Sequence, residues 1–237
     1  MTPVDRDLDW PGCHNVRDLG GLPTADGRAI RTGALIRADS LQYLTPEGVE
    51  VVRGAGVSRI IDLRSDRELA EAPTPFSGDP LALQVAVQEP ADPQGRTTIV
   101  DTCTDMLDQH PQRFAAALRA FIEAPEGAVV VHCHGGKDRT GMIVALALSI
   151  AGVPEDEIVA DYALTQSRLA GMLAEQLAAE PDTSLHPKMI EFRDTRAASL
   201  TAILRHLDTH HGGPTTYLLN AGLTPTDLDT LRTRLTQ

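Results

Sequence analysis

The stretch "VVVHCHGGKDRTGMIVALALSIAG", residues 129–152, decides the fold. It opens with a β-branched run typical of a buried strand, passes through a loop with two glycines, and ends in an apolar run typical of a buried helix. This order builds an anion cradle, because loop N–H groups point inward and a helix N-terminus carries about half a positive charge. The stretch therefore predicts an anion site at the turn between strand and helix.

Two side chains in this turn predict its chemistry. Cys133 stands at the start of the cradle, where the positive surroundings favour its nucleophilic thiolate. Arg139 follows six residues later, and its planar guanidinium can bind two oxygens of a phosphate. We therefore expect the thiolate to attack phosphorus, with the loop and Arg139 holding the equatorial oxygens. A cysteinyl-phosphate then forms and is hydrolysed.

The residues between and after this pair fit the same reaction. Gly135 and Gly136 let the backbone approach a ligand with no side chain in the way. Thr140 can place a hydroxyl next to the sulfur, and Gly141 allows tight packing of the first helical turn. Residues 133–140 are therefore predicted to form a phosphate-binding loop.

The composition limits what kind of protein carries this loop. The chain has 237 residues, of which 42% are hydrophobic and 23% charged, as in an ordinary globular protein. Its net charge of −12 argues against binding nucleic acid. Three cysteines with no CxxC pair argue against a disulfide framework or a structural zinc site.

Targeting signals are not apparent either. The acidic start "MTPVDRDLDWPG" is not typical of a signal peptide, and the longest apolar stretch is about half of what a bilayer span needs. We expect a cytoplasmic protein without cofactor, metal or stable membrane association. The sequence does not indicate an oligomeric state.

Strands alternate with helices along the first part of the chain. We expect strands at 57–62, 81–87 and 127–132. Helices are expected from 46 to Gly54 or Gly56, at 66–72 and at 106–124. Thr45 is the expected N-cap of the helix that Pro46 begins.

After Gly152 the pattern is helical, with predicted helices at 154–180, 186–212, 215–221 and 224–235. We predict one α/β domain over residues 1–237, with three layers, a central and mostly parallel sheet of about four or five strands, and a helical C-terminal portion. Helices on either side of 181–187 are candidates for a movable lid over residues 165–195.

The segment "HCHGGKDRTG" at 132–141 resembles the signature loop of the protein tyrosine phosphatase superfamily. With "NVRDLGG" at 15–21, "IDLRSDRE" at 61–68 and "ADYALT" at 160–165, the chain resembles the bacterial atypical tyrosine/lipid phosphatase family from about residue 10 to its C-terminal end. The resemblance implies a tyrosine-phosphatase-like fold and hydrolysis of phosphotyrosine or phosphoinositide substrates.

The resemblance also assigns roles within the loop. It implies that Cys133 is the nucleophile, that Arg139 clamps the phosphate and that Thr140 eases departure of the thiolate. Lys137 would supply a second cation, and Asp138 would donate the proton to the leaving oxygen. The catalytic candidates are thus Cys133, Arg139, Asp138 and Asp62; the candidates for binding phosphate or substrate are His134, Gly135, Gly136, Lys137, Asp138, Arg139, Thr140 and Arg64, with no metal ligand.

The identity of the acid stays open at this point. Asp138 could instead be a helix cap or an ion-pair partner. Asp62 lies at the end of its strand and is the rival, unless it is a structural carboxylate bonded to loop N–H groups or to Arg64. Three further acids lie upstream, where typical relatives carry a mobile-loop acid: Asp92, Asp101 and Asp105.

Other functions remain possible for the same loop. A small phosphorylated metabolite or nucleotide fits it as well as phosphotyrosine does. A catalytically silent phosphate-binding module would lack the cysteine or the arginine, and both are present. Sulfur transfer by a rhodanese-like enzyme also uses a cysteine loop, but Arg139 followed by Thr140 and Gly141 speaks against it.

The remaining polar residues are given structural roles. We expect Arg17 to pair with Asp18, and His132 to orient the loop. His210 and His211 invite a metal-site interpretation, but neighbouring residues of a helix point to different faces, which favours an ordinary surface. The cysteines outside the loop, Cys13 and Cys103, are expected to be bystanders.

Overall fold

The computed structural model describes residues 6–88, 98–192 and 195–237. Its sheet has the order β1-β2-β5-β3-β4 within the described residues. The antiparallel edge strand is β1 (Arg17–Asp18), and the parallel strands are β2 (Leu35–Ala38), β3 (Val57–Asp62), β4 (Ala82–Gln84) and β5 (Ala128–His132). The prediction of a mostly parallel sheet of about four or five strands is confirmed.

The central strand β5 carries the functional turn. All five of its residues are buried, because helices cover both faces of the sheet. Its last residue, His132, is in register with Ala38 at the end of β2 and with Asp62 at the end of β3. Three parallel strands therefore end together at the sheet edge where Cys133 follows, and ligands gather at this edge in such folds.

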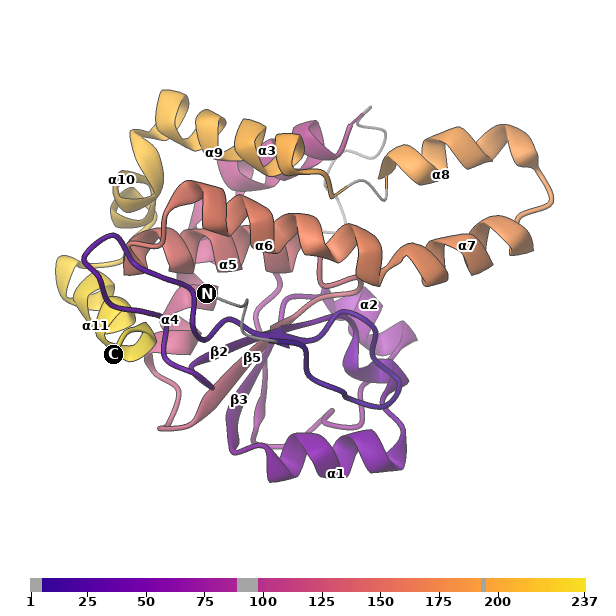
Figure 1. Ribbon diagram of the computed structural model, residues 1–237, viewed down its shortest axis with the longest axis horizontal. Coiled ribbons are helices and arrows are strands. Elements are labelled where there is room, and N and C mark those ends of the chain that lie inside the picture. The colour runs from indigo at the N-terminus through magenta and orange to yellow at the C-terminus, as the bar shows by residue number, and fades with distance from the viewer. Residues whose placement is uncertain (1–5, 89–97, 193–194) are drawn as a thin grey trace.

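Alternating side chains of the strands divide the core into two parts. Ile36 and Val130 pack on one face in a cluster that includes Trp10 and Val52 of α1 (Pro46–Gly54). The neighbouring residues of the same strands join the larger cluster on the other face. Figure 1 shows α1 below the sheet with α5 and α6 above it. The three layers predicted from the sequence are therefore present.

The larger layer contains most of the helices. They are α3 (Ile99–Gln109), α4 (Pro111–Ile122), α5 (Asp138–Ala151), α6 (Glu155–Arg168), α9 (Ala197–His211), α10 (Gly213–Asn220) and α11 (Pro225–Leu235). The short α2 (Asp66–Glu71) lies between β3 and β4 in the chain. The helical C-terminal portion is confirmed.

Several helix starts follow from local signals. Thr45 accepts a hydrogen bond from Gly48 N at 3.1 Å and caps α1, as predicted. Ser65 and Glu68 form a capping box at the start of α2, in which each side chain accepts from the other residue's backbone N–H. Such caps satisfy N–H groups that have no partner inside the helix.

Some predicted element bounds are wrong. The helix predicted over 106–124 is two helices, because Pro111 lacks an N–H and its ring would clash with the carbonyl of Leu107. That carbonyl instead accepts a hydrogen bond from Tyr217 Oη at 2.9 Å. The helix predicted over 154–180 also breaks after Arg168, the one over 186–212 is two separate helices, and the strand predicted over 81–87 is only three residues long.

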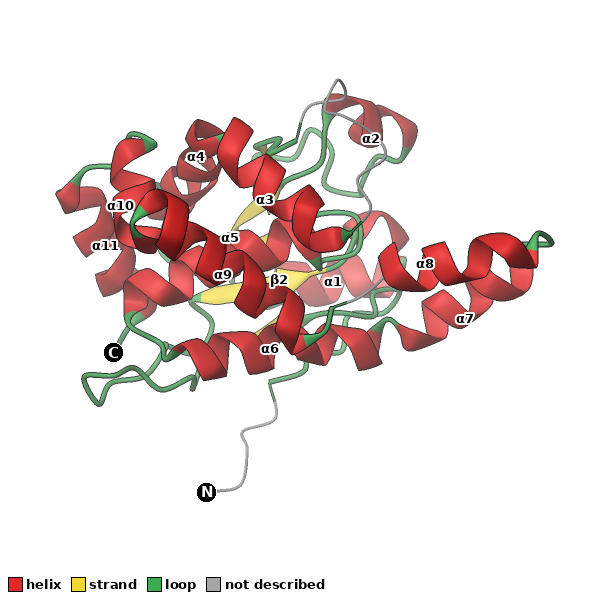
Figure 2. Ribbon diagram, turned by 90° about the horizontal axis from the view of Figure 1, so that it is seen from above, coloured by secondary structure: helices red, strands yellow, loops and turns green. Residues whose placement is uncertain are grey.

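Residues 170–192, within the segment predicted as a lid, form an arm that projects from the body (Figures 1 and 2). We define the arm as α7 (Ala170–Ala179), the short 3-10 helix Thr183–Leu185 and α8 (His186–Phe192). No residue of α7 is buried. No helix in the described parts of the chain is long and apolar enough to cross a membrane.

Candidate active site

The loop between β5 and α5 carries the site. The strand ends at His132, and α5 begins at Asp138, inside the motif identified from the sequence. Gly136 has φ +62°, and a Cβ on it would lie only 2.3 Å from the carbonyl oxygen of Ala38. Only glycine fits there, because the position combines a left-handed backbone with close approach to β2.

The carbonyl groups of this loop are held from behind. Asn15 Nδ2 donates to the carbonyl oxygens of Gly135 and Gly136 at 3.2 Å each, and Arg37 Nη2 donates to Gly136 O at 2.8 Å. The carbonyl of His134 accepts from Ser40 N at 3.0 Å. In a trans peptide the N–H points opposite to the C=O. Three successive N–H groups therefore face away from these anchors, which is the geometry of an anion cradle.

A buried carboxylate holds those anchors in place. Asp161 accepts hydrogen bonds from Arg17 Nε at 3.0 Å, Arg37 Nη1 at 2.8 Å and Arg6 Nη1 at 2.9 Å. Burial opposes its charge, but the arginines outweigh burial and hold the pKa of Asp161 well below its ordinary value. Arg17 also donates to Asn15 Oδ1 at 2.6 Å. The segments "NVRDLGG" and "ADYALT" therefore act together as a brace behind the loop.

The prediction that Arg17 pairs with Asp18 is wrong. Arg17 binds Asp161 across the molecule, while Asp18 accepts from Gly20 N at 2.8 Å and from Gly33 N at 2.7 Å. The carboxylate that satisfies Arg17 lies 144 positions away in the chain. The adjacent acid is thus occupied by the turn that follows β1.

The first turn of α5 packs against α6. A Cβ on Gly141 would lie 2.8 Å from Cε2 of Tyr162, so the glycine allows this aromatic ring to approach. Thr140 Oγ1 is buried and has no hydrogen-bond partner among the described residues. Its hydroxyl is therefore available to a group that binds or forms beside the loop.

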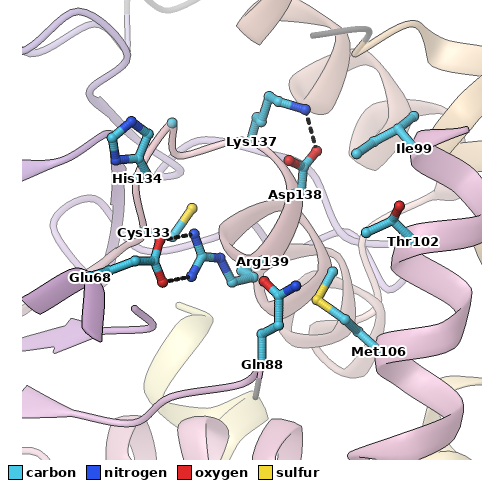
Figure 3. A pocket seen from close by; sticks show the side chains of 11 residues that line it. Glu68, Gln88, Ile99, Thr102, Met106, Cys133, His134, Lys137, Asp138 and Arg139 are labelled. Carbon is cyan, nitrogen blue, oxygen red and sulfur yellow. Dashed lines mark hydrogen bonds and ion pairs between the residues drawn. The ribbon is translucent and has the colours of Figure 1, made fainter. Parts of the chain in front are cut away.

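The loop opens into a cavity of about 190 Å³, shown in Figure 3. Cys133 lines it together with Arg139, and the loop's His134 is exposed at its edge. Ile99, Thr102 and Met106 of α3 line the side opposite the cysteine (Figure 3). The full lining is Glu68, Gln88, Ile99, Thr102, Met106, Cys133, His134, Gly135, Lys137, Asp138 and Arg139.

Sequence reasoning missed one residue that touches the arginine. Glu68 binds Arg139 with two parallel hydrogen bonds, Oε2 to Nη1 at 2.6 Å and Oε1 to Nη2 at 2.7 Å. Burial opposes its charge, but Arg139 and Ser65 outweigh burial and lower the pKa of Glu68 to about 2. Glu68 lies in the quoted segment "IDLRSDRE". The segment is consistent with a capping role for Glu68, but nothing in it indicates that the same carboxylate also binds Arg139.

The two acids proposed from the sequence lie in different places. Asp138 lines the cavity, and its Oδ1 accepts from Lys137 Nζ at 2.7 Å. Asp62 is buried outside the cavity lining and accepts from Arg64 Nε at 3.0 Å and Nη2 at 2.7 Å. Burial opposes the charge on Asp62, but His132 and Arg64 outweigh burial and lower its pKa.

The other candidates lie away from the cavity. Arg64, besides holding Asp62, donates to Ala72 O at 2.8 Å and is fully buried. Asp101 and Asp105 belong to α3, and neither lines the described cavity. Asp92 lies outside the described residues. Among the candidate acids that the structure describes, only Asp138 lines this cavity.

His132 supports the loop from the strand side. Its Nδ1 lies 3.2 Å from the carbonyl oxygen of Cys133, and burial lowers its pKa. Cys103 is fully buried on α3, and burial raises its pKa well above the ordinary value. Burial likewise raises the pKa of the Cys13 thiol. Neither of these two thiols lines the cavity.

Comparison with known proteins gives the family. The family model described as "Tyrosine phosphatase family" matches residues 8–237. The triple specificity protein phosphatase PtpB of Mycobacterium tuberculosis is 29% identical, with 94% of this chain and 97% of the relative covered. A putative tyrosine-protein phosphatase of Cupriavidus necator is also 29% identical, with 91% and 84% covered. For a tyrosine-protein phosphatase of Nostoc commune, identity is 29% and coverage is 91% and 78%.

A looser likeness exists to a crystal structure of P. aeruginosa TpbA bound to phosphotyrosine. It has 14% identity and a TM-score of 0.32, covers 76% of this chain and 90% of that one, and is too weak to support an argument. The family match is decisive because it spans nearly the whole chain. The chain belongs to the tyrosine phosphatase family, and the protein is a phosphatase. The resemblance drawn from the motifs is confirmed.

Proposed function

We propose that the protein hydrolyses phosphomonoesters through a phosphocysteine intermediate on Cys133. The observation that carries this proposal is the fixed loop: three peptide carbonyls are anchored from behind, while Cys133 and Arg139 line one cavity. Such a cradle stabilises charge on the equatorial oxygens without reorganising during the reaction. Arg139 is already oriented by Glu68 and keeps further N–H groups for the phosphate.

The reaction then has two steps. In the first, Cys133 Sγ attacks phosphorus, the P–O ester bond breaks, and the leaving oxygen takes a proton from Asp138. In the second, the Asp138 carboxylate accepts a proton from water, whose oxygen attacks phosphorus and breaks the S–P bond. The hydroxyl of Thr140, which has no other partner among the described residues, donates to the departing thiolate. Inorganic phosphate is released, and the thiolate of Cys133 is regenerated.

Asp138 is favoured over Asp62 as the acid on two grounds. It lines the cavity, whereas Asp62 lies outside the lining. Arg64 also binds both oxygens of the Asp62 carboxylate, which holds it in a buried structural ion pair. This supports the structural role for Asp62 that the sequence left open.

Phosphotyrosine is the substrate class that the cavity favours. Ile99 and Met106 provide a buried apolar wall opposite the nucleophile, which suits a phenyl ring. The second cation, Lys137, is bound to Asp138. An acidic chain also disfavours anionic membranes and therefore phosphoinositide surfaces. Relatives described as tyrosine phosphatases support the same choice.

The test is hydrolysis by wild type, Cys133→Ser and a matched control, Cys13→Ser. We expect activity on an aryl phosphate and on phosphotyrosine peptides in wild type and control, and none in Cys133→Ser. Activity that survives in Cys133→Ser would refute the phosphocysteine mechanism. Vanadate binding without turnover by wild type would instead indicate a silent phosphate-binding module. Faster turnover of a phosphorylated metabolite or nucleotide than of any peptide would overturn the substrate assignment alone.

A further inference from the structure

A cluster of metal-ligating side chains lies outside the active site, where α3 packs on α9. Asp108 comes from the last turn of α3, and His206 and His211 come from the C-terminal half of α9. The Nε2 atoms of His206 and His211 lie 2.8 Å and 2.7 Å from Asp108 Oδ1. All three potential ligand atoms are within 4.8 Å of one another.

This arrangement changes the interpretation of the histidine pair. His210 and His211 do diverge, as neighbouring residues of a helix should, but His211 meets His206 instead. The third member, Asp108, is 98 positions away from His206 in the chain. A search for adjacent or regularly spaced ligands in the sequence could not find this set.

Both imidazole rings are held in place by aromatic neighbours. His206 stacks on His210 with ring centroids 4.3 Å apart and an interplanar angle of 22°. His211 packs edge-on against Tyr217, with centroids 5.2 Å apart and an angle of 80°. Tyr217 in turn donates to the carbonyl of Leu107, the residue before Asp108. Tyr217 therefore orients the ring of His211 and also fixes the end of α3, the helix that carries Asp108.

The donor set has a defined chemical preference. Two imidazole nitrogens and one carboxylate oxygen form a ligand set that zinc uses with water in the fourth position. The side chains of His206 and His211 are 19% and 26% exposed, so an ion can enter from solvent while the rings stay ordered. The net charge of −12 raises the local concentration of cations around the protein.

We propose that Asp108, His206 and His211 bind one divalent transition-metal ion of the zinc type, with water completing the coordination. The ion joins α3 to α9 and takes no part in phosphoryl transfer. Its position has a structural consequence, because Met106 on the same helix lines the catalytic cavity two residues before Asp108. The metal therefore stabilises the wall that we assign to the substrate ring.

The test is metal binding by the chelator-treated full chain in the Cys133→Ser background, which removes the reactive thiol as a competing ligand. We expect one Zn²⁺ per chain by calorimetry, a higher Tm with Zn²⁺, and a Co²⁺ spectrum of a nitrogen and oxygen site without thiolate charge transfer. His206→Gln and His211→Gln should each weaken binding by more than the roughly 100-fold that loss of a supporting group can cost.

His210→Gln is the matched control, since it removes the neighbouring ring and leaves all three ligands. We expect it to weaken Zn²⁺ binding by less than about tenfold, the lower end for a supporting group. The proposal is overturned if no stoichiometric Zn²⁺ binding occurs in the Cys133→Ser protein. Binding that survives both ligand substitutions, or a Co²⁺ spectrum with thiolate charge transfer, would overturn it as well.

Discussion

The loop of residues 133–140 and the arm lie next to each other but are built in opposite ways. Leu169, at the base of α7, is 3.9 Å from the place a Cβ on Gly135 would take. In the loop, three successive carbonyls are bound by groups from β2, the turn after it and the N-terminal segment. In α7 no residue is buried, and a Cβ on Gly171 would meet no atom within 4 Å.

This difference teaches where the chain fixes its geometry. A cradle for a transition state must keep its donors in position, and many independent contacts provide that rigidity. An element with few buried contacts opens or shifts at low cost. Substitutions in the loop should therefore have large effects, and matched substitutions in the arm should have small ones.

The largest effect is expected for Asp138→Asn. Loss of the proton donor should slow hydrolysis of an alkyl phosphate by about 100- to 10,000-fold and an activated aryl phosphate much less, because a good leaving group needs no proton. Measuring kcat/KM for both substrates tests this. Asp62→Asn is the control, and we expect it to slow both substrates equally. If Asp62→Asn slowed the alkyl phosphate much more than the aryl phosphate, and Asp138→Asn slowed both equally, Asp62 would be the acid.

Gly136→Ala comes next. The added Cβ would lie 2.3 Å from Ala38 O at a backbone with φ +62°, so the peptide must shift and its N–H donors move. We expect a loss of about 100- to 1,000-fold in kcat, comparable to the removal of one oxyanion donor. The measurement is steady-state kinetics with an aryl phosphate. Unchanged kinetics would show that the cradle does not depend on this backbone.

Asp161→Asn should mainly affect stability. The substitution leaves the buried Arg17 and Arg37 without their carboxylate, and breaking a buried ion pair costs about 3–5 kcal/mol. Denaturant unfolding measures this free energy. Glu175→Gln on the exposed side of α7 is the matched control and should change it by less than about 0.5 kcal/mol. Equal effects of the two variants would contradict the bracing role of Asp161.

Glu68→Gln should lower kcat/KM by about 10- to 100-fold, because Arg139 loses its bidentate partner and its orientation. It also has a pH signature. The pKa of Glu68 falls from 4.5 to about 2 in the folded protein, so its ionised form stabilises the fold at higher pH. The stability difference between wild type and variant should be constant above pH 4.5 and disappear as the pH falls toward about 2. A difference that persists to pH 2 would contradict the ion pair.

The smallest effect is expected for Gly171→Ala in the arm. The position is helical and open, so alanine should stabilise the protein by about 0.4–1 kcal/mol and leave kcat unchanged. Thermal unfolding and steady-state kinetics check both points. A loss of activity comparable to that of Gly136→Ala would show that the arm, too, needs a fixed geometry.

Much of the site could be predicted because its signals are local. Strand, loop and helix occur within residues 129–152, and the cysteine and arginine are six positions apart. Caps such as Thr45 also act within one turn. The split at Pro111 had a local signal as well, since proline cannot continue a helix, but the apolar spacing on both sides hid it.

The sequence by itself determined the strand, loop and helix that bring Cys133 and Arg139 together, and it predicted their roles as nucleophile and phosphate clamp. Only the tertiary structure decided which partners serve it, because Asn15 and Asp161 reach the site from opposite parts of the chain. The same holds for Glu68 on Arg139 and for Asp108 beside two histidines of α9. Local patterns act over a few residues, whereas contacts across 70 to 150 positions depend on strand order and helix packing.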